Sequence, residues 1–65
     1  MHIYLNGEQR NTDACSITEL LAELGLQGRM IAIECNMEVV PKSTYAEATL
    51  AEGDRLEIVH MIGGG

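Results

Sequence analysis

The chain has 65 residues, of which 46% are apolar and 22% are charged, and its formal net charge is −6. This length allows one domain with a small core and leaves no room for a cleft that encloses a substrate, which argues against a self-sufficient enzyme. The acidic balance argues against nucleic acid and anionic membrane surfaces as partners. It either suits a partner protein with a basic face or serves only solubility.

The cysteines and histidines form no recognisable motif. Cys15 and Cys35 are too few for a disulfide framework, and neither has a cationic neighbour in the sequence that would favour a reactive thiolate. His2 and His60 show no metal-ligand spacing with them, so no metal site and no catalytic residue is predicted. Residues 1–5 enter a strand-like pattern rather than a leader, and no apolar run could cross a bilayer. We therefore expect a cytoplasmic protein.

The chain begins with a predicted β-hairpin. Residues 1–5 alternate and are rich in strand-forming side chains. Asn6 and Gly7 follow, and Asn-Gly is the strongest short hairpin signal in a sequence. Residues 8–12 should therefore return antiparallel to the first strand.

A helix is predicted from Ser16, which is a good N-cap, and Glu19 three residues later completes a capping box. The apolar residues then recur at i, i+3, i+4 and i+7, so that they form one stripe: Ile17, Leu20, Leu21 and Leu24. The residues off the stripe should face water: Thr18, Glu19 and Glu23. Gly25 suits the C′ position that ends a helix, with Leu26 packing back on the last turn.

Three more strands are predicted after the helix. Residues 30–34 should form a buried strand, and residues 38–40 a short one. Pro41 should end this short strand or lie on an edge, because proline cannot donate to a ladder. A helical turn is expected within residues 43–46 and a turn at 51–54. Residues 56–62 form the last strand. Its alternation should direct Leu56 and Ile58 into the core, and Glu57 and Val59 outward.

This order of elements predicts an α+β fold with a mixed sheet of about five strands and one main helix across one face. The last strand should lie in the middle of the sheet, parallel to the first, which is the β-grasp or ubiquitin-like arrangement. Residues 1–62 are predicted to form a single β-grasp domain, and residues 63–65 a flexible glycine tail.

The tail consists of Gly63, Gly64 and Gly65. Glycine has no side chain and no strong conformational preference, so such a tail can enter a channel where any Cβ would collide. The α-carboxylate of Gly65 is a poor electrophile, and adenylation by ATP would activate it for attack by sulfur. The partner enzyme would then supply positioning and charge stabilisation. A frayed terminus or a remnant of expression is the alternative interpretation.

The whole chain resembles the ubiquitin-like sulfur carrier proteins of thiamine biosynthesis. The resemblance rests on the stretches IYLNG (3–7), SITELL (16–21), IAIECN (31–36), VP (40–41) and GD (53–54), and above all on LEIVHMIGGG (56–65). The family ends in Gly-Gly, whereas this chain has a third glycine, so Gly64 would carry the sulfur if Gly65 were trimmed.

The resemblance implies a cycle in which the chain is a carrier and not an enzyme. An E1-like adenylating enzyme would activate Gly65 with ATP, and the carrier itself would bind no cofactor. A cysteine desulfurase would supply sulfur, and the resulting thiocarboxylate would donate it to thiazole synthase. Rival interpretations are a sulfur carrier for molybdopterin or another product, a ubiquitin-like protein modifier, and a binding module whose glycines are incidental.

A docking surface for these partners is predicted beside the tail. It would comprise Val59, Met61 and Ile62, because exposed apolar residues at this place suit an interface. The alternative is that these side chains pack on the domain's own sheet.

Overall fold

The computed structural model describes residues 1–61, so the predictions for Ile62 and for residues 63–65 lie outside the described residues. The predicted order of elements is confirmed, and a short 3-10 helix precedes the last strand. The elements are β1 (His2–Leu5), β2 (Glu8–Asn11), α1 (Ile17–Leu24), β3 (Ile31–Cys35), β4 (Glu38–Val39), η1 (Lys42–Thr44) and β5 (Arg55–His60).

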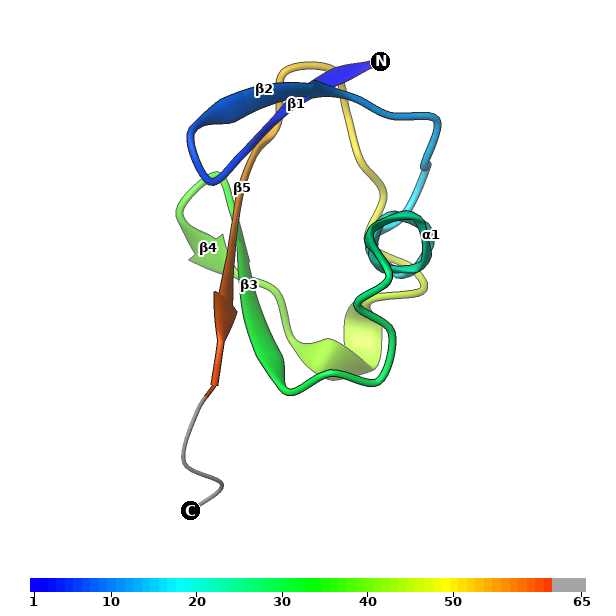
Figure 1. Ribbon diagram of the computed structural model, residues 1–65, viewed down its shortest axis with the longest axis vertical. Helices are drawn as coiled ribbons and strands as arrows, with labels where there is room; N and C mark the ends of the chain where they lie inside the picture. The colour runs from blue at the N-terminus through cyan, green and yellow to red at the C-terminus, as the bar shows by residue number, and fades with distance from the viewer. Residues whose placement is uncertain (62–65) are drawn as a thin grey trace.

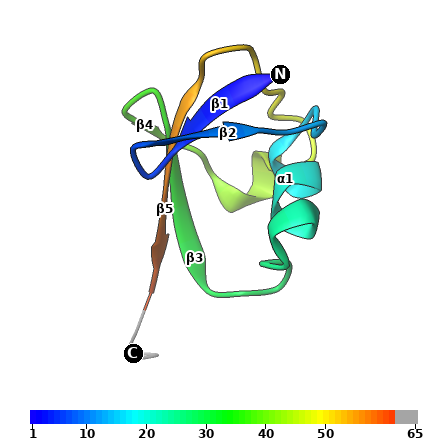
Figure 2. The same ribbon diagram turned by 45° about the horizontal axis from the view of Figure 1, so that its top comes forward.

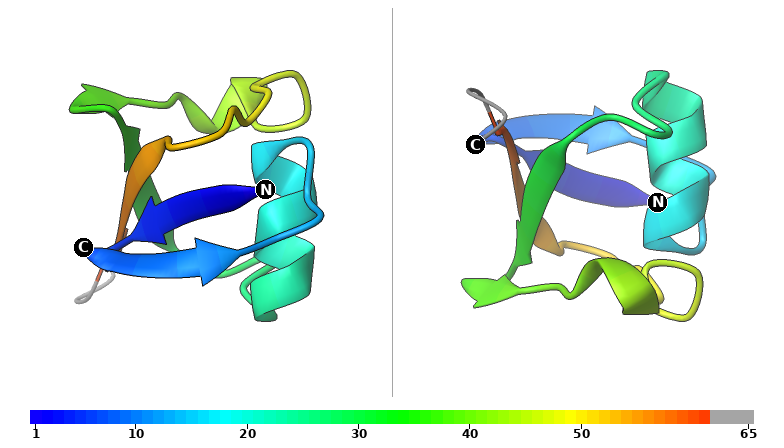
Figure 3. Two further views of the ribbon diagram at one scale, coloured as in Figure 1. Left: turned by 90° about the horizontal axis from the view of Figure 1, so that it is seen from above. Right: turned by 90° about the horizontal axis from the view of Figure 1, so that it is seen from below.

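The five strands form one mixed sheet in the order β2-β1-β5-β3-β4. β5 lies in the middle, parallel to β1 and antiparallel to β3. The helix α1 crosses one face of the sheet, and the other face has no helix over it (Figures 1 and 2). Views along the long axis separate the curved sheet from α1 in the same way (Figure 3). The predicted β-grasp arrangement is confirmed.

The hairpin turns at Asn6 and Gly7, which both have positive φ, 50° and 85°. A two-residue turn of this kind matches the twist of the flanking strands. The second strand ends at Asn11, one residue earlier than predicted, where its pairing with the first residue of β1, His2, ends. Thr12 is 3% exposed; its hydroxyl donates to the Glu23 carboxylate at 2.8 and 2.9 Å and accepts from the Ala14 N–H at 3.0 Å.

The helix forms as its sequence predicts. The Ser16 hydroxyl accepts from the Glu19 N–H at 3.2 Å, while the Glu19 carboxylate accepts from the N–H of Cys15 at 2.8 Å, one residue before the N-cap. Gly25 has φ 72°, its N–H donates to Ala22 O, and the Leu26 N–H donates to Leu21 O. This pair of bonds is a Schellman motif, which satisfies carbonyls that the helix end leaves open.

The third strand differs from its prediction, because only one of its faces is buried. Ile31 and Ile33 are buried under α1, but Glu34 is exposed and Met30 is 59% exposed just before the strand. Boundaries also shift: β3 is Ile31–Cys35 rather than 30–34, β4 ends at Val39 rather than at residue 40, and the short 3-10 helix begins at Lys42 rather than Ser43. Only one face of β3 is buried because α1 covers a single face of the sheet.

The core lies between α1 and the inner face of the sheet. Its largest fully buried side chains come from both layers: Ile3, Ile17, Leu20, Ile33 and Leu56. Leu56 is 1% and Ile58 8% exposed, so the predicted inward face of the last strand is confirmed. The strand is Arg55–His60, so it begins one residue earlier than the predicted 56–62 and ends before Met61.

Candidate functional site

The candidate site is the C-terminal end of β5, because the three glycines come soon after it in the sequence. Both neighbours hold this strand in the sheet. On one side, the Asn6 amide accepts from the Ile58 N–H at 2.8 Å and donates to Ile58 O at 3.4 Å. On the other side, the Met61 N–H donates to Met30 O at 2.9 Å. The backbone is therefore anchored up to the last described residue.

An apolar surface faces outward beside this end. Val59 is 59% and Met61 52% exposed, so at least half of the surface of each residue is open to solvent. Ala32 lies directly opposite Val59, and Met30 is joined to Met61 through the backbone. We call Met30, Ala32, Val59 and Met61 the outward apolar surface. Ile62, the third predicted docking residue, lies outside the described residues.

Acidic side chains border this surface. Glu57 lies directly opposite Glu34 on the outward face, and both are exposed. Like charges in this arrangement destabilise a sheet. Neither carboxylate forms an ion pair with any other described residue. The Arg55 guanidinium instead lies 4.7 Å from the centroid of the Tyr4 ring. A basic side chain of a partner could therefore approach the two glutamates.

The cysteines lie apart from this end of β5. The pKa of the Cys35 thiol is raised by burial, and further by the carboxylates of Asp54 and Glu38. A raised pKa keeps this thiol protonated and poorly nucleophilic. Cys15 is exposed just before the helix cap, and both thiols are free. The environment of Cys35 thus supports the predicted structural role over a sulfur relay.

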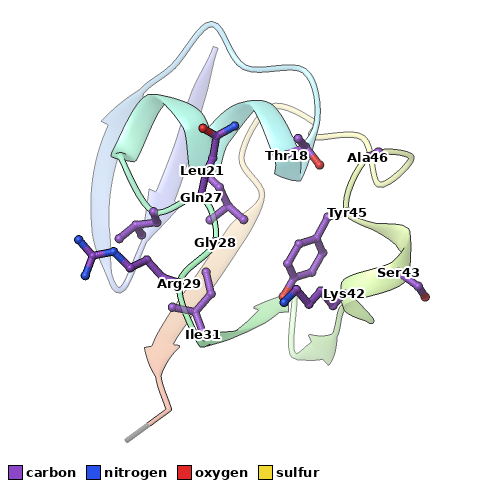
Figure 4. A pocket seen from close by; sticks show the side chains of 11 residues that line it. Thr18, Leu21, Gln27, Gly28, Arg29, Ile31, Lys42, Ser43, Tyr45 and Ala46 are labelled. Carbon is purple, nitrogen blue, oxygen red and sulfur yellow. The ribbon is translucent and has the colours of Figure 1, made fainter.

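A hollow of about 350 Å³ opens between α1, the loop after it and the segment around η1. In Figure 4, the side chain of Lys42 lies beside the Tyr45 ring, and the guanidinium of Arg29 points away from that ring. The lining has no carboxylate, histidine or cysteine: it consists of Thr18, Leu21, Leu26, Gln27, Gly28, Arg29, Ile31, Lys42, Ser43, Tyr45 and Ala46. Its hydroxyl and basic groups belong to Thr18, Arg29, Lys42, Ser43 and Tyr45, and no side-chain hydrogen bond joins any two of these residues.

The two histidines were the remaining candidates for metal binding. His2 lies 3.6 Å from Glu52 at the far end of the sheet, and His60 is exposed on β5. Within residues 1–61, His, Cys, Asp and Glu side chains form no group of three or more that could hold a metal ion. Over the same residues, no helix is long and apolar enough to span a membrane.

Sequence reasoning missed two parts of the site. The outward positions of Met30 and Ala32 could have been predicted from the alternation of residues 30–34, which was interpreted as wholly buried. The contact of Asn6 with Ile58 had no local signal, because the two residues are 52 positions apart.

Comparison with known proteins places this geometry in a family. Residues 3–65 match the ThiS family. A thiazole synthase of Paramagnetospirillum magneticum is 52% identical over 66 residues, and this chain spans only 20% of that longer protein. The sulfur carrier protein ThiS of Bacillus subtilis is 37% identical over 97% of this chain and 98% of its own.

A solved structure agrees. The crystal structure of the thiamine biosynthesis protein ThiS from Geobacter metallireducens is 30% identical, covers all of both chains and superposes with a TM-score of 0.86. The family match over nearly the whole chain, the similarity in sequence and the shared fold show that this chain belongs to the ThiS family of sulfur carrier proteins.

Proposed function

We propose that this chain carries sulfur for the thiazole ring of thiamine, as a thiocarboxylate on Gly65. The observation that carries the proposal is the position of β5 in a ThiS-family fold. The strand is central in the sheet, and the next residue, Met61, is hydrogen-bonded to Met30. Ile62 and three glycines follow in the sequence. The folded domain would thereby present to a partner a short chain end whose last three residues have no side chains.

The chemistry assigned to Gly65 has three steps. An E1-like adenylating enzyme joins the carboxylate to AMP from ATP and releases pyrophosphate. A persulfide, whose sulfur comes from a cysteine desulfurase, displaces AMP. A thiol then reduces the sulfur–sulfur bond of the acyl persulfide and leaves the thiocarboxylate. Thiazole synthase accepts that sulfur, and ATP is bound by the partner and not by the carrier.

The division of labour between carrier and partner follows from the described residues. Among the described residues, no nucleophile of the hollow or of the end of β5 is hydrogen-bonded to a side-chain base, and we assign the catalytic groups to the partners. The carrier contributes recognition. The outward apolar surface would dock against the partner, with Ile62 continuing it, and Glu57 and Glu34 would meet basic side chains.

The thiazole synthase relatives support the choice of sulfur acceptor. Their chains are about five times as long as this one and contain a segment similar to all of it. A carrier segment within the same polypeptide as the synthase has a high effective concentration at its active site. The two free thiols favour a reducing compartment, and we place the protein in the cytoplasm.

Intact-mass spectrometry tests the proposal. The chain is incubated with ATP, the adenylating enzyme, a cysteine desulfurase and cysteine. The expected product is heavier by the difference between one sulfur and one oxygen atom, and fragmentation places the change on Gly65, or on Gly64 if the end is trimmed. A chain that keeps its plain carboxylate under these conditions would refute the proposal, and conjugates of high mass would indicate a protein modifier instead.

A deletion separates the tail from the fold. A chain that lacks Gly64 and Gly65 should keep its circular dichroism spectrum and lose thiazole formation. Loss of the fold in that variant would mean that the tail is structural.

A further inference from the structure

The backbone of β5 alternates between its two neighbours. In an antiparallel pair, alternate residues direct both backbone groups toward the partner strand. The Asn36 N–H donates to Arg55 O and the Met61 N–H donates to Met30 O, so odd-numbered residues of β5 bond toward β3. The even-numbered residues, His60 among them, direct their N–H and C=O toward the β1 side.

The β1 side ends before it reaches His60. Backbone pairing of β1 with β5 stops at Leu5 and Leu56. The Asn6 N–H then donates to Leu56 O, and the Asn6 side chain satisfies both backbone groups of Ile58. Beyond that point the chain turns away at Gly7. Figures 1 and 2 show β5 continuing past the hairpin turn with β3 along one side only.

The edge of β5 at His60 therefore has backbone groups to which no strand in residues 1–61 is paired. An edge of this kind is a template for another extended chain. Here His60 stands in the sequence directly between Val59 and Met61, two residues of the outward apolar surface.

The place of Gly65 in the sequence limits how far from this edge a partner that acts on it can be. Four residues follow Met61, and an extended chain of that length reaches about 13 Å. A partner that acts on Gly65 must therefore approach within that distance of the end of β5. It cannot bind the tail without coming close to the free edge.

We propose that thiazole synthase adds an extended segment to β5 at His60, in line with β1, and so holds the tail straight for sulfur transfer. The inference rests on the proposed function. The segment accepts the His60 N–H and donates to the His60 carbonyl. On the outward face, its side chains meet Val59 and Met61, and a basic residue reaches Glu57. A second copy of this chain suits the edge less well, because each copy carries a net charge of −6.

Proline at residue 60 tests the backbone directly. The missing N–H points to the free edge and not to β3, so β5 can keep its own sheet bonds in His60→Pro. His60→Ala is the matched variant, since it loses the side chain and keeps the N–H. The affinity of both for thiazole synthase is measured by calorimetry. We expect the proline variant to bind at least tenfold more weakly than the alanine variant, which is about 1.4 kcal/mol.

Hydrogen exchange gives a readout that does not depend on how the variant folds. In the wild-type chain, exchange of the His60 amide should slow at least tenfold when thiazole synthase is added. Unchanged exchange would refute strand addition, as would equal affinities of two folded variants. Strong protection of this amide in the isolated protein would show that the edge is already covered before thiazole synthase is added, by a second copy or by the chain itself, and would also overturn the proposal.

The two proposals fail separately. Thiocarboxylate formation on the wild-type chain is measured by mass spectrometry in the same preparation. If the wild type is loaded while His60 stays unprotected in the complex, only strand addition fails. If the wild type is never loaded, the proposed function fails.

Discussion

Replacement of Asn6 by glycine should loosen the strand that leads to the tail. The Asn6 side chain accepts from the Ile58 N–H at 2.8 Å and donates to Ile58 O at 3.4 Å, and Ile58 is 8% exposed. Glycine keeps the positive φ of 50° without strain and removes both bonds. An unpaired, partly buried N–H should lower the free energy of unfolding by about 1–2 kcal/mol. For a domain of this size, that corresponds to a drop in Tm of roughly 4–16 °C.

Asn6→Asp separates the two bonds. Aspartate tolerates the same backbone conformation and keeps the acceptor for the shorter bond, but it loses the donor. Urea unfolding followed by circular dichroism should therefore place it between the wild type and Asn6→Gly. Equal stability of the aspartate and glycine variants would refute the assignment of the stabilisation to the Ile58 N–H. A glycine variant as stable as the wild type would refute the whole argument.

Three further predictions concern the core, the helix cap and a thiol. Leu20→Ala should cost about 2–5 kcal/mol in chemical unfolding, because this α1 side chain is fully buried in the core between the helix and the sheet, and a loss under 1 kcal/mol would contradict the assigned packing. Ser16→Ala should cost about 1 kcal/mol, since the hydroxyl caps the Glu19 N–H, whereas Ser16→Asp should cost much less. Iodoacetamide should alkylate Cys35 more slowly than exposed Cys15 near pH 8, because burial, Asp54 and Glu38 raise the pKa of the Cys35 thiol. Because the folded state holds the Cys35 proton more tightly than the unfolded state does, the protonated thiol contributes fully to the free energy of unfolding at neutral pH. This contribution is lost as the pH rises through the raised pKa. Asp54→Asn should speed alkylation, as mass spectrometry of the labelled peptides would show, and an unchanged rate would contradict the role of that carboxylate.

The sequence by itself determined the local elements. The cap at Ser16 and the Schellman motif at Gly25 are made by contacts between residues a few positions apart, so their pattern is enough to predict α1. The Asn-Gly turn is local in the same sense. The alternation of Leu56 and Ile58 predicts which face of β5 points into the core. The number and order of the elements favour the β-grasp as the fold that buries these side chains.

Only the tertiary structure decided which surfaces remain free. The mainly apolar residues 30–34 do not by themselves indicate whether one or both faces of the strand will be buried. In the structure, one helix covers one face of the sheet, and Met30 stays exposed. The Glu34–Glu57 pair and the Asn6–Ile58 contact join residues far apart in the sequence, so no local pattern signals them. The open edge at His60 exists because β1 ends before β5 does, which depends on the register between two strands about 50 residues apart.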